Sequence, residues 1–384
     1  MEGIPMKLIK EYIFQWCDTQ FPAHLSLLKE LAAIPAPSHQ EDQRAIFIRD
    51  WLADQGAETA VIDSAKNVIL ELGKKPYLTV MAHTDVVFPD TTPLPVREEN
   101  GILYAPGVGD DTANVAALMF CAKFFIEHPG LLPESLLIVF NSCEEGLGNL
   151  KGIRQIMSDY EDQIHSLVSF DCQSNAIISR AVGSERWKVS VSTRGGHSFS
   201  DFGNANAIAC LSSLIQKLYM QEIPQKEGCT TTYNVGLISG GTSVNTIAQH
   251  AQMTYEYRSD DRDCLACMAK QFQELIQESN SPDVGIQAES LGIRPCGGDV
   301  PRNAHEELLN RCKNAILSVY PQEIPFCAAS TDANIPLSRG IPAATFGLYR
   351  GGGAHTRQEY VEADSLTPGL KIAMSFFFGT DLDE

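Results

Sequence analysis

The 384-residue sequence predicts an α/β protein, with a mainly parallel mixed sheet flanked by helices and a smaller α+β sandwich domain inserted into it. In the first half, short apolar runs alternate with helical patterns, which is typical of a parallel sheet covered on both faces. From about Glu185, apolar and polar residues alternate, which indicates strands with one exposed face. A chain of this length exceeds what one core usually holds, so we expect two domains.

The N-terminal part begins with two helical patterns, residues 6–34 and 39–55, separated by the loop Pro35-Ala36-Pro37-Ser38. The expected buried strands that follow are 68–72, 77–82, 136–140 and 167–170. Residues 112–127 are rich in Ala and Phe and predict a long helix between the second and third of these strands.

The inserted part has its own order of elements. We expect strands at 187–192, 230–238, 251–258 and 284–289, with helices at 204–220 and 262–279. This β-α-β-β-α-β order fits a small α+β sandwich. After residue 296 the first pattern returns, with helices at 304–319 and 364–377 around a β-like run at 343–348. We therefore assign 1–184 and 296–384 to one domain and 185–295 to the insertion.

The composition excludes some classes of partner and indicates the cellular compartment. The formal net charge of −19 should repel nucleic acid and anionic membranes, so we expect neither as a partner. The 11 cysteines are odd in number and lack a disulfide-framework spacing, which favours a reducing, cytoplasmic compartment. No apolar run approaches the roughly 18 residues that a membrane span needs, and the N-terminus does not resemble a signal peptide.

Ionisable residues follow four of the apolar runs. These residues are His83 and Asp85, the adjacent Glu144 and Glu145, Asp171, and His355. A further pair, Asp110-Asp111, follows a Gly-rich turn. The carboxyl ends of parallel strands meet at one edge of a sheet, so these side chains should converge. Because clustered carboxylates resist ionisation without compensation, a mixed His and carboxylate set indicates bound zinc, with manganese or cobalt as alternatives.

Each of these residues also has a purely structural interpretation. Asp110-Asp111 could cap a helix, and His355 could lie on the surface of its Gly-rich loop. Taken one at a time, the structural interpretations are favoured. The occurrence of so many ligand-type side chains at successive strand ends favours a metal site.

The motifs resemble those of a known family. The matching stretches, in order, are His83-Thr84-Asp85, Gly107-Val108-Gly109-Asp110-Asp111, Cys143-Glu144-Glu145-Gly146, Asp171, Gly195-Gly196-His197-Ser198 and Gly353-Ala354-His355. They are similar to the di-zinc exopeptidases and amidases that include peptidase T, glutamate carboxypeptidase, carnosinase and aminoacylase, with the peptidase T-like members most similar. The resemblance extends over nearly the whole chain, including the insertion.

The resemblance implies a role for each residue. Two zinc ions per chain would be held by His83 and Asp171, by Glu145 and His355, and by Asp110 as a ligand shared between them. Glu144 would be the general base acting on a water held between the metals. Asp85 would accept a hydrogen bond from the ring of His83.

In the insertion, the resemblance implies a lid and dimerisation domain. His197 would stabilise the tetrahedral oxyanion, in its own or a partner's active site, as in dimeric relatives. Asn245, in a Gly-Gly-Thr-x-x-Asn stretch, would contact the substrate backbone, and Arg258 would pair with a substrate carboxylate. Without the resemblance, His197 could be a loop histidine, and Arg258 could form a surface salt bridge with a neighbour such as Asp260.

The implied activity is hydrolysis of short peptides by a di- or tripeptidase-like exopeptidase, such as an aminopeptidase. The alternative is an amidase that removes an acyl group from an amino acid. Asp171 favours a peptidase, since aminoacylase-type amidases often have glutamate there. Thr112 stands where many relatives have lysine, but no metal ligand is lost. A non-enzymatic metal-binding protein and a cysteine hydrolase using Cys143 are the remaining hypotheses, and the two acids after Cys143 disfavour a thiolate.

Overall fold

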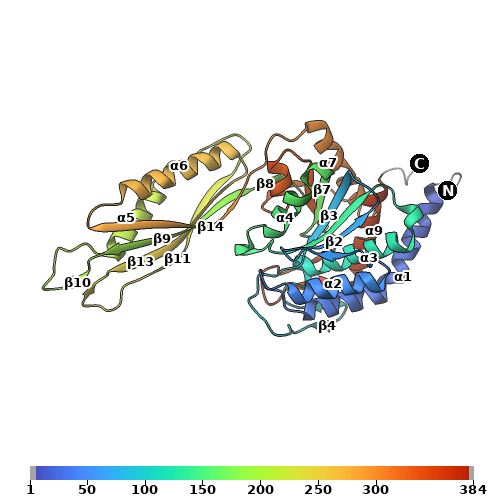
Figure 1. Cartoon of the computed structure of the whole chain (residues 1–384), viewed down its shortest axis with the longest axis horizontal. Coiled ribbons are helices and arrows are strands. Elements are labelled where there is room, and N and C mark those ends of the chain that lie inside the picture. The colour runs from blue at the N-terminus through green and yellow to red at the C-terminus, as the bar shows by residue number, and fades with distance from the viewer. Residues whose placement is uncertain (1–5, 380–384) are drawn as a thin grey trace. The chain divides into compact units, whose positions relative to one another are not determined.

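The computed structural model describes residues 6–379 and divides the chain into two compact units (Figure 1). Unit 1 comprises Met1–Arg180 and Asp299–Glu384, and unit 2 comprises Ala181–Gly298. The expected insertion, 185–295, lies within unit 2.

Unit 1 contains an eight-stranded mixed sheet. In spatial order its strands are β1 (Val61–Ile62), β2 (Val68–Leu72), β6 (Leu136–Asn141), β3 (Tyr77–His83), β7 (Ile164–Phe170), β16 (Ala343–Phe346), β8 (Ile177–Ala181) and β15 (Phe326–Ala329). The four central strands, β6, β3, β7 and β16, are parallel, whereas β2 and β8 pair antiparallel with their neighbours. The expected fold class is therefore confirmed.

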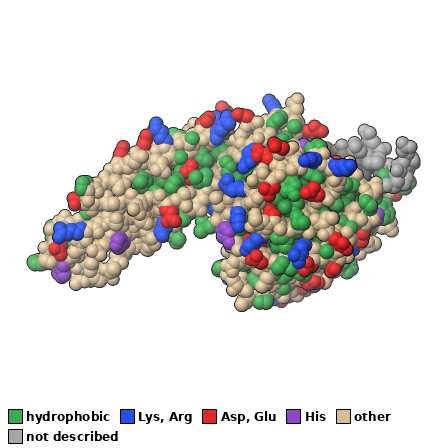
Figure 2. All heavy atoms as spheres, viewed as in Figure 1, with side chains coloured by type: hydrophobic (Ala, Val, Ile, Leu, Met, Phe, Trp, Pro, Cys, Tyr) green, Lys and Arg blue, Asp and Glu red, His purple; other side chains and the backbone are tan. Residues whose placement is uncertain are grey.

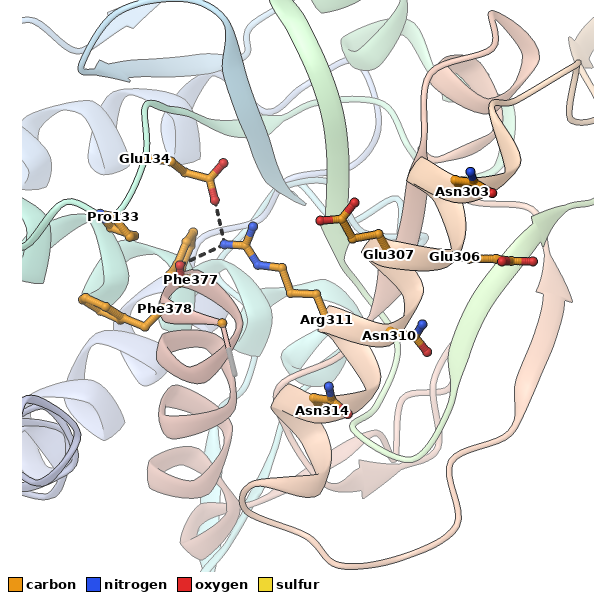
Figure 3. Close-up of a pocket in the computed structure, with 11 residues that line it drawn as sticks. Pro133, Glu134, Asn303, Glu306, Glu307, Asn310, Arg311, Asn314, Phe377 and Phe378 are labelled. Atoms are coloured by element: carbon orange, nitrogen blue, oxygen red, sulfur yellow. Dashed lines mark hydrogen bonds and ion pairs between the residues drawn. The ribbon is translucent and has the colours of Figure 1, made fainter. Parts of the chain in front are cut away.

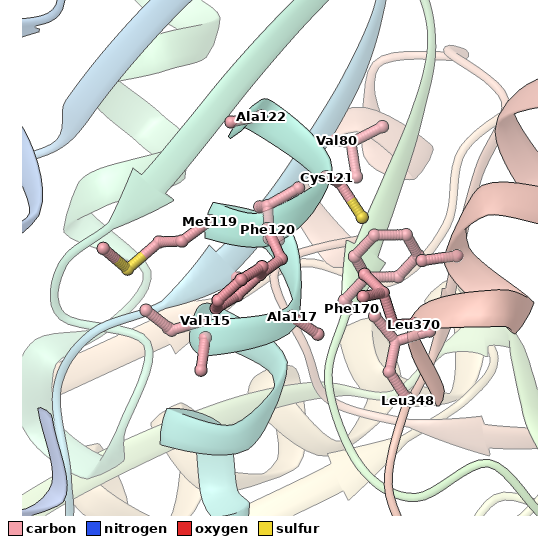
Figure 4. Close-up of a cluster of buried hydrophobic side chains, with 14 of the residues drawn as sticks. Val80, Val115, Ala117, Met119, Phe120, Cys121, Ala122, Phe170, Leu348 and Leu370 are labelled. Atoms are coloured by element: carbon pink, nitrogen blue, oxygen red, sulfur yellow. The ribbon is translucent and has the colours of Figure 1, made fainter. Parts of the chain in front are cut away.

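Both faces of the sheet are covered. Every residue of β3 and β6 is buried, and because side chains alternate between faces, both faces must be packed. The helices of unit 1 are α1 (Met6–Ala33), α2 (Asp42–Asp54), α3 (Asn114–Glu127), α4 (Lys151–Tyr160), α7 (Arg302–Leu317), α8 (Asn334–Ser338) and α9 (Leu366–Phe378). Helix α3 is buried on nearly all sides, and Figure 4 shows its side chains beside those of β3, β7 and α9.

Two features of unit 1 that bear on the site differ from the sequence expectation, besides the unexpected β1, α4, β8 and β15. The helix expected from Thr112 begins at Asn114, because Val108–Ala113 forms an irregular turn with non-helical backbone angles at Asp110 and Asp111. A second, antiparallel sheet was not anticipated. It consists of β17 (Gly351–Gly352), β18 (Tyr360–Glu362), β5 (Ile102–Tyr104) and β4 (Arg97–Glu99). These strands are too short to show a period of two in the sequence.

Unit 2 is a four-stranded antiparallel sheet with two helices and a short strand pair. The strands are β11 (Thr231–Gly240), β13 (His250–Ser259), β9 (Gly183–Thr193) and β14 (Val284–Arg294), and the pair is β10 (Gly196–His197) with β12 (Thr246–Ile247). Helices α5 (Ala207–Tyr219) and α6 (Arg262–Glu278) share a core with the sheet. In β13, Met253, Tyr255 and Tyr257 are buried in this core, so the residues between them lie on the other face.

Charges of both signs are mixed on the face drawn in Figure 2, and the cysteines of the described residues form no disulfide. Figure 2 shows Lys and Arg side chains interspersed with Asp and Glu over the face drawn there. All 11 cysteines lie within residues 6–379 and are free thiols. Among the described residues, no helix has both the length and the apolar character needed to cross a membrane.

A pocket of about 680 Å³ lies between α7 and the end of α9. In Figure 3, Arg311 reaches across it to Glu134 and the backbone of α9. Its guanidinium donates to the carbonyl oxygens of Phe376 and Phe377 at 2.6 and 2.8 Å and lies 2.7 Å from Glu134. These contacts satisfy the last carbonyls of the helix, so we interpret Arg311 as a structural cation.

Candidate metal centre

The strand ends bring the predicted ligands to one edge of the central sheet. Strand β3 ends at His83, β6 is followed by the Glu144-Glu145 turn, and β7 is followed directly by Asp171. Because β6, β3 and β7 are parallel neighbours, their carboxyl ends lie side by side. The irregular turn with Asp110 and the loop with His355 complete the edge.

Asp110 lies between two histidines. Its Oδ1 is 3.1 Å from Nε2 of His83, and its Oδ2 is 3.1 Å from Nε2 of His355. The same nitrogen of His355 is 3.2 Å from Oε1 of Glu145. A carboxylate with its two oxygens directed to different ligand groups has the geometry that a shared ligand of two cations requires.

Two overlapping groups of side chains in the described part of the chain could each hold a cation. One is His83, Asp110 and Glu145, and the other is His83, Asp111 and Asp171, with ligand atoms within 4.8 Å of one another. Asp111 already accepts hydrogen bonds on both oxygens, from the backbone N–H of His83 at 2.9 Å and from Asn114 at 2.6 Å. Asp110 is therefore the aspartate of the pair that is more available as a metal ligand. Asp111 instead holds the backbone of His83 and the side chain of Asn114.

The pKa values of the group are set by burial and by the charges of its own members. Burial alone would lower the pKa of His83, but Asp111, Asp110 and Asp85 outweigh it and raise that pKa well above its usual value. Hydrogen bonds to Asp110 and Glu145 raise the pKa of His355 to about 10. Burial, followed by the charge of Asp110, raises the pKa of Asp171 to about 6. Protons on His83 and His355 thus compensate the charge of the carboxylates.

Asp85 holds the turn that carries the adjacent glutamates. Its Oδ1 and Oδ2 accept the backbone N–H groups of Glu144 and Glu145, each at 2.9 Å, and Oδ2 also accepts the Ser38 hydroxyl at 2.6 Å. Nδ1 of His83 lies 3.0 Å from the backbone carbonyl oxygen of Asp85 and 3.5 Å from its Oδ1. The backbone oxygen is thus the nearer partner of the ring, and the carboxylate mainly orients the glutamates.

Glu359 plays the same part for the Gly-rich turn. This buried carboxylate accepts the backbone N–H groups of Gly107, Gly109 and Asp110 at 2.8, 2.9 and 2.7 Å. Gly107 has a φ of 72°, a left-handed conformation that favours glycine. Sequence reasoning missed both Glu359, which accepts backbone N–H groups, and Ser38, whose hydroxyl donates to Asp85, because such supporting contacts leave no ligand motif in the sequence.

Glu144 is buried at the same edge but belongs to neither cation-binding group. Its charge contributes to raising the pKa of Glu145 and of the buried Asp332. In both cases burial is the larger cause. Asp332 accepts a hydrogen bond from Asn141, at the end of β6, at 2.6 Å. Glu144 is therefore a carboxylate close to the ligands and outside the sets that would hold a cation.

Cys143 has no properties of a nucleophile. Its thiol is buried, and burial and the hydrogen bond to Glu41 raise its pKa to about 12. The sulfur lies 3.1 Å from Oε1 of Glu41 and 3.3 Å from Nδ1 of His39. Since the thiolate is the reactive form, this environment disfavours the cysteine hydrolase hypothesis.

The predicted substrate residues lie in unit 2, where two of them share a loop cluster. His197 pairs with Thr246 in the β10–β12 ladder, and the N–H of Ser198 donates to the carbonyl oxygen of Asn245 at 3.0 Å. Nδ1 of His197 accepts the backbone N–H of Phe199 at 3.2 Å. In a neutral ring, an accepting Nδ1 places the proton on Nε2, so Nε2 is a donor.

Arg258 lies on the face of β13 opposite the core. Its Nε and Nη2 each lie 3.1 Å from an oxygen of Glu256, two residues earlier on the strand. The salt bridge considered for Arg258 therefore forms with Glu256. This fork holds the guanidinium in a fixed orientation.

Comparison with known proteins shows which family and which relatives this chain resembles. The model of Peptidase family M20/M25/M40 matches residues 79–378. A putative succinyl-diaminopimelate desuccinylase, DapE, of Mycobacterium tuberculosis is 24% identical over 366 residues, which cover 92% of this chain and 98% of that protein.

Solved structures show the same fold. Aminopeptidase PepT from Bacillus cereus has a TM-score of 0.72 at 17% identity, covering 95% of this chain and 99% of that one. The di-peptidase Dug1p from Saccharomyces cerevisiae has a TM-score of 0.74 at 17% identity, covering 99% and 100%. The family model spans far more than half of the sequence, and the chain belongs to the M20/M25/M40 family of metallohydrolases.

Proposed function

We propose that this chain is a di-metal exopeptidase that hydrolyses the amide bonds of short peptides, as a di- or tripeptidase-like aminopeptidase. The observation that carries the proposal is the placement of Asp110 between His83 and His355, next to Glu145 and Asp171, with Glu144 alongside. The donor set of imidazoles and carboxylates suits zinc, with manganese or cobalt as alternatives. His83 and Asp171 would hold one ion, Glu145 and His355 the other, and Asp110 both.

When bound, two such ions polarise the scissile carbonyl and make water a better nucleophile at neutral pH. Glu144, close to the ligands without belonging to them, takes a proton from the attacking water and passes it to the leaving nitrogen. Asp85 fixes the backbone of Glu144, and thereby the position of the general base. Nε2–H of His197 donates to the developing oxyanion, in its own or a partner's active site.

Substrate selection is assigned to unit 2. Arg258 would pair with a carboxylate of the substrate, and the exposed Asn245 would contact its backbone. The strand β11 is an edge strand with exposed Leu237 and Ile238, and we infer that this unit also forms a homodimer. The free thiols of all 11 cysteines support a cytoplasmic location.

The alternative function is removal of an acyl group from an amino acid. The similarity to a desuccinylase over 92% of the chain favours it. Asp171 favours the peptidase, because amidases of the aminoacylase type often have glutamate at this position. The two reactions differ in the substrate's α-nitrogen, which is a free amine in the peptide and is acylated in the alternative.

The substrate class can be decided by comparing a tripeptide that has a free amine with N-acetyl and N-succinyl amino acids, using the zinc-loaded protein. We expect kcat/KM for the tripeptide to exceed that of either acyl amino acid by at least about tenfold, equivalent to about 1.4 kcal/mol. Release of the amino acid is the measurement. Faster cleavage of an acyl amino acid would establish the amidase instead.

Substitutions of Glu144 and Glu145 should have different effects. Glu144→Gln removes the general base and should lower kcat by about 10²- to 10⁴-fold while the bound metal stays at the wild-type level. Glu145→Gln removes a ligand and should weaken metal binding first. Metal content by atomic emission, with kcat on the tripeptide, measures both. Equal losses of activity with full metal in both variants would contradict this division of roles.

His197→Ala should lower kcat by about 10²- to 10³-fold, because it removes one donor to the oxyanion, and should leave the metal content unchanged. His250→Ala, at an exposed histidine of β13 in the same unit, is the matched control and should retain full activity. An active His197→Ala protein would remove this residue from the reaction.

Metal binding should release protons. Because the pKa of His355 is raised to about 10 in the metal-free protein, its ring is protonated at neutral pH and must lose a proton to become a ligand. The apparent zinc affinity should therefore rise from pH 6.5 to 8.5. Calorimetric titrations of metal-free protein in two buffers with different ionisation enthalpies would measure the protons released. An affinity that is constant over this range, with no proton release, would contradict the pKa assignment.

A further inference from the structure

Arg44 is a buried cation without an assigned role. It is the third residue of α2, and its side chain is only 1% exposed. Arginine is almost never buried to this extent unless its charge is compensated. Burial lowers its pKa to about 10, with Asp85 and Asp111 acting in the opposite direction, so the side chain is still charged at neutral pH.

The guanidinium of Arg44 contacts two turns of the candidate metal centre. Nη1 donates to the carbonyl oxygen of Thr84 at 2.9 Å and to Oγ1 of Thr112 at 3.1 Å. Nε donates to the carbonyl oxygen of Ile34 at 3.1 Å, which holds the side chain in place from a third segment. One rigid group thus joins segments that lie 40 and 68 residues further along the chain.

Both contacted residues are structurally coupled to ligands. Thr84 stands between His83 and Asp85, and its N–H and hydroxyl both donate to the carbonyl oxygen of Asn141, at 2.7 and 3.0 Å. The hydroxyl of Thr112 donates to the carbonyl oxygen of Gly107 at 2.5 Å, which closes the irregular turn around Asp110. A shift of the guanidinium would therefore move His83 and Asp110 relative to each other.

We propose that Arg44 is a positioning residue of the metal centre: through its hydrogen bonds to Thr84 and Thr112 it fixes the turn of His83 relative to the turn of Asp110, and it places a permanent positive charge near Asp85 and Asp111. The proposal rests on the proposed metal-dependent function. It makes a distinctive prediction, because the two effects of a buried cation oppose each other. Its charge repels a bound metal, whereas its hydrogen bonds hold the ligands in the geometry that binds one.

The test is the zinc affinity of Arg44→Met, which removes the charge and the donors but keeps much of the side-chain volume. We expect zinc to bind about 10- to 100-fold more weakly, as is typical when a group that orients a ligand is lost. At saturating zinc, kcat should fall and KM for the tripeptide should change less than twofold. Calorimetric titration of metal-free protein with zinc alone measures the affinity without relying on activity.

Two further variants distinguish positioning from a general effect on folding. Arg44→Lys retains an ammonium donor but lacks the fork, so it should bind zinc with an affinity between those of the wild type and Arg44→Met. Arg49→Met, on the same helix but at the surface, is the matched control and should bind zinc like the wild type. Circular dichroism verifies the fold of each variant.

These experiments distinguish failure of the Arg44 proposal from failure of the proposed peptidase function. Zinc affinity in Arg44→Met that is unchanged or tighter than in the wild type would overturn the positioning role, whatever the activity of the wild type. If Arg44→Met does not fold, the decision passes to Arg44→Lys, and wild-type affinity in that variant overturns the role. A wild-type protein that binds zinc but cleaves no peptide would instead refute the proposed peptidase function and leave the role of Arg44 standing.

Discussion

The accumulation of negative charge at one sheet edge is the constraint on which the rest of the structure depends. Asp85, Asp111, Glu144, Glu145, Asp171, Asp332 and Glu359 are all buried, and Asp110 lies among them. Ionised carboxylates cannot share a buried space without compensation. In this chain the compensation comes from His83 and His355, from backbone N–H groups and from Arg44, and it leaves a set of oxygen and nitrogen donors suited to cations.

These acids fall into two classes that the sequence does not distinguish. Asp85 and Glu359 use their oxygens to accept backbone N–H groups, which hold the two turns that carry Glu144, Glu145 and Asp110. Among the ligand candidates, Asp110 and Glu145 direct theirs to histidine rings. The first class therefore shapes the backbone of the site, and the second supplies oxygen atoms that can bind a metal. Arg44 links the turn of His83 to the turn of Asp110 through its hydrogen bonds to Thr84 and Thr112.

The family assignment determines the class of chemistry more firmly than the substrate. Desuccinylases and peptidases both break an amide bond, so the same metal edge serves either reaction. The solved structures at 17% identity show a shared fold. Discrimination must come from groups that contact the ends of the substrate, and Arg258, Asn245 and His197 in unit 2 are the candidates. Because they lie on strands and loops of a separate unit, their chemistry can vary without altering the metal edge.

The sequence by itself determined the fold class, because buried parallel strands and exposed antiparallel ones differ in hydrophobic period. It also pointed to His83, Glu144, Glu145, Asp171 and His355, because residues that follow parallel strands must meet at one edge. The short second sheet, the irregular turn at Asp110, and the contacts of Ser38, Arg44 and Glu359 were decided only by the tertiary structure. These features depend on hydrogen bonds between segments far apart in the chain, such as Glu359 to Asp110, which leave no periodic or local signal in the sequence.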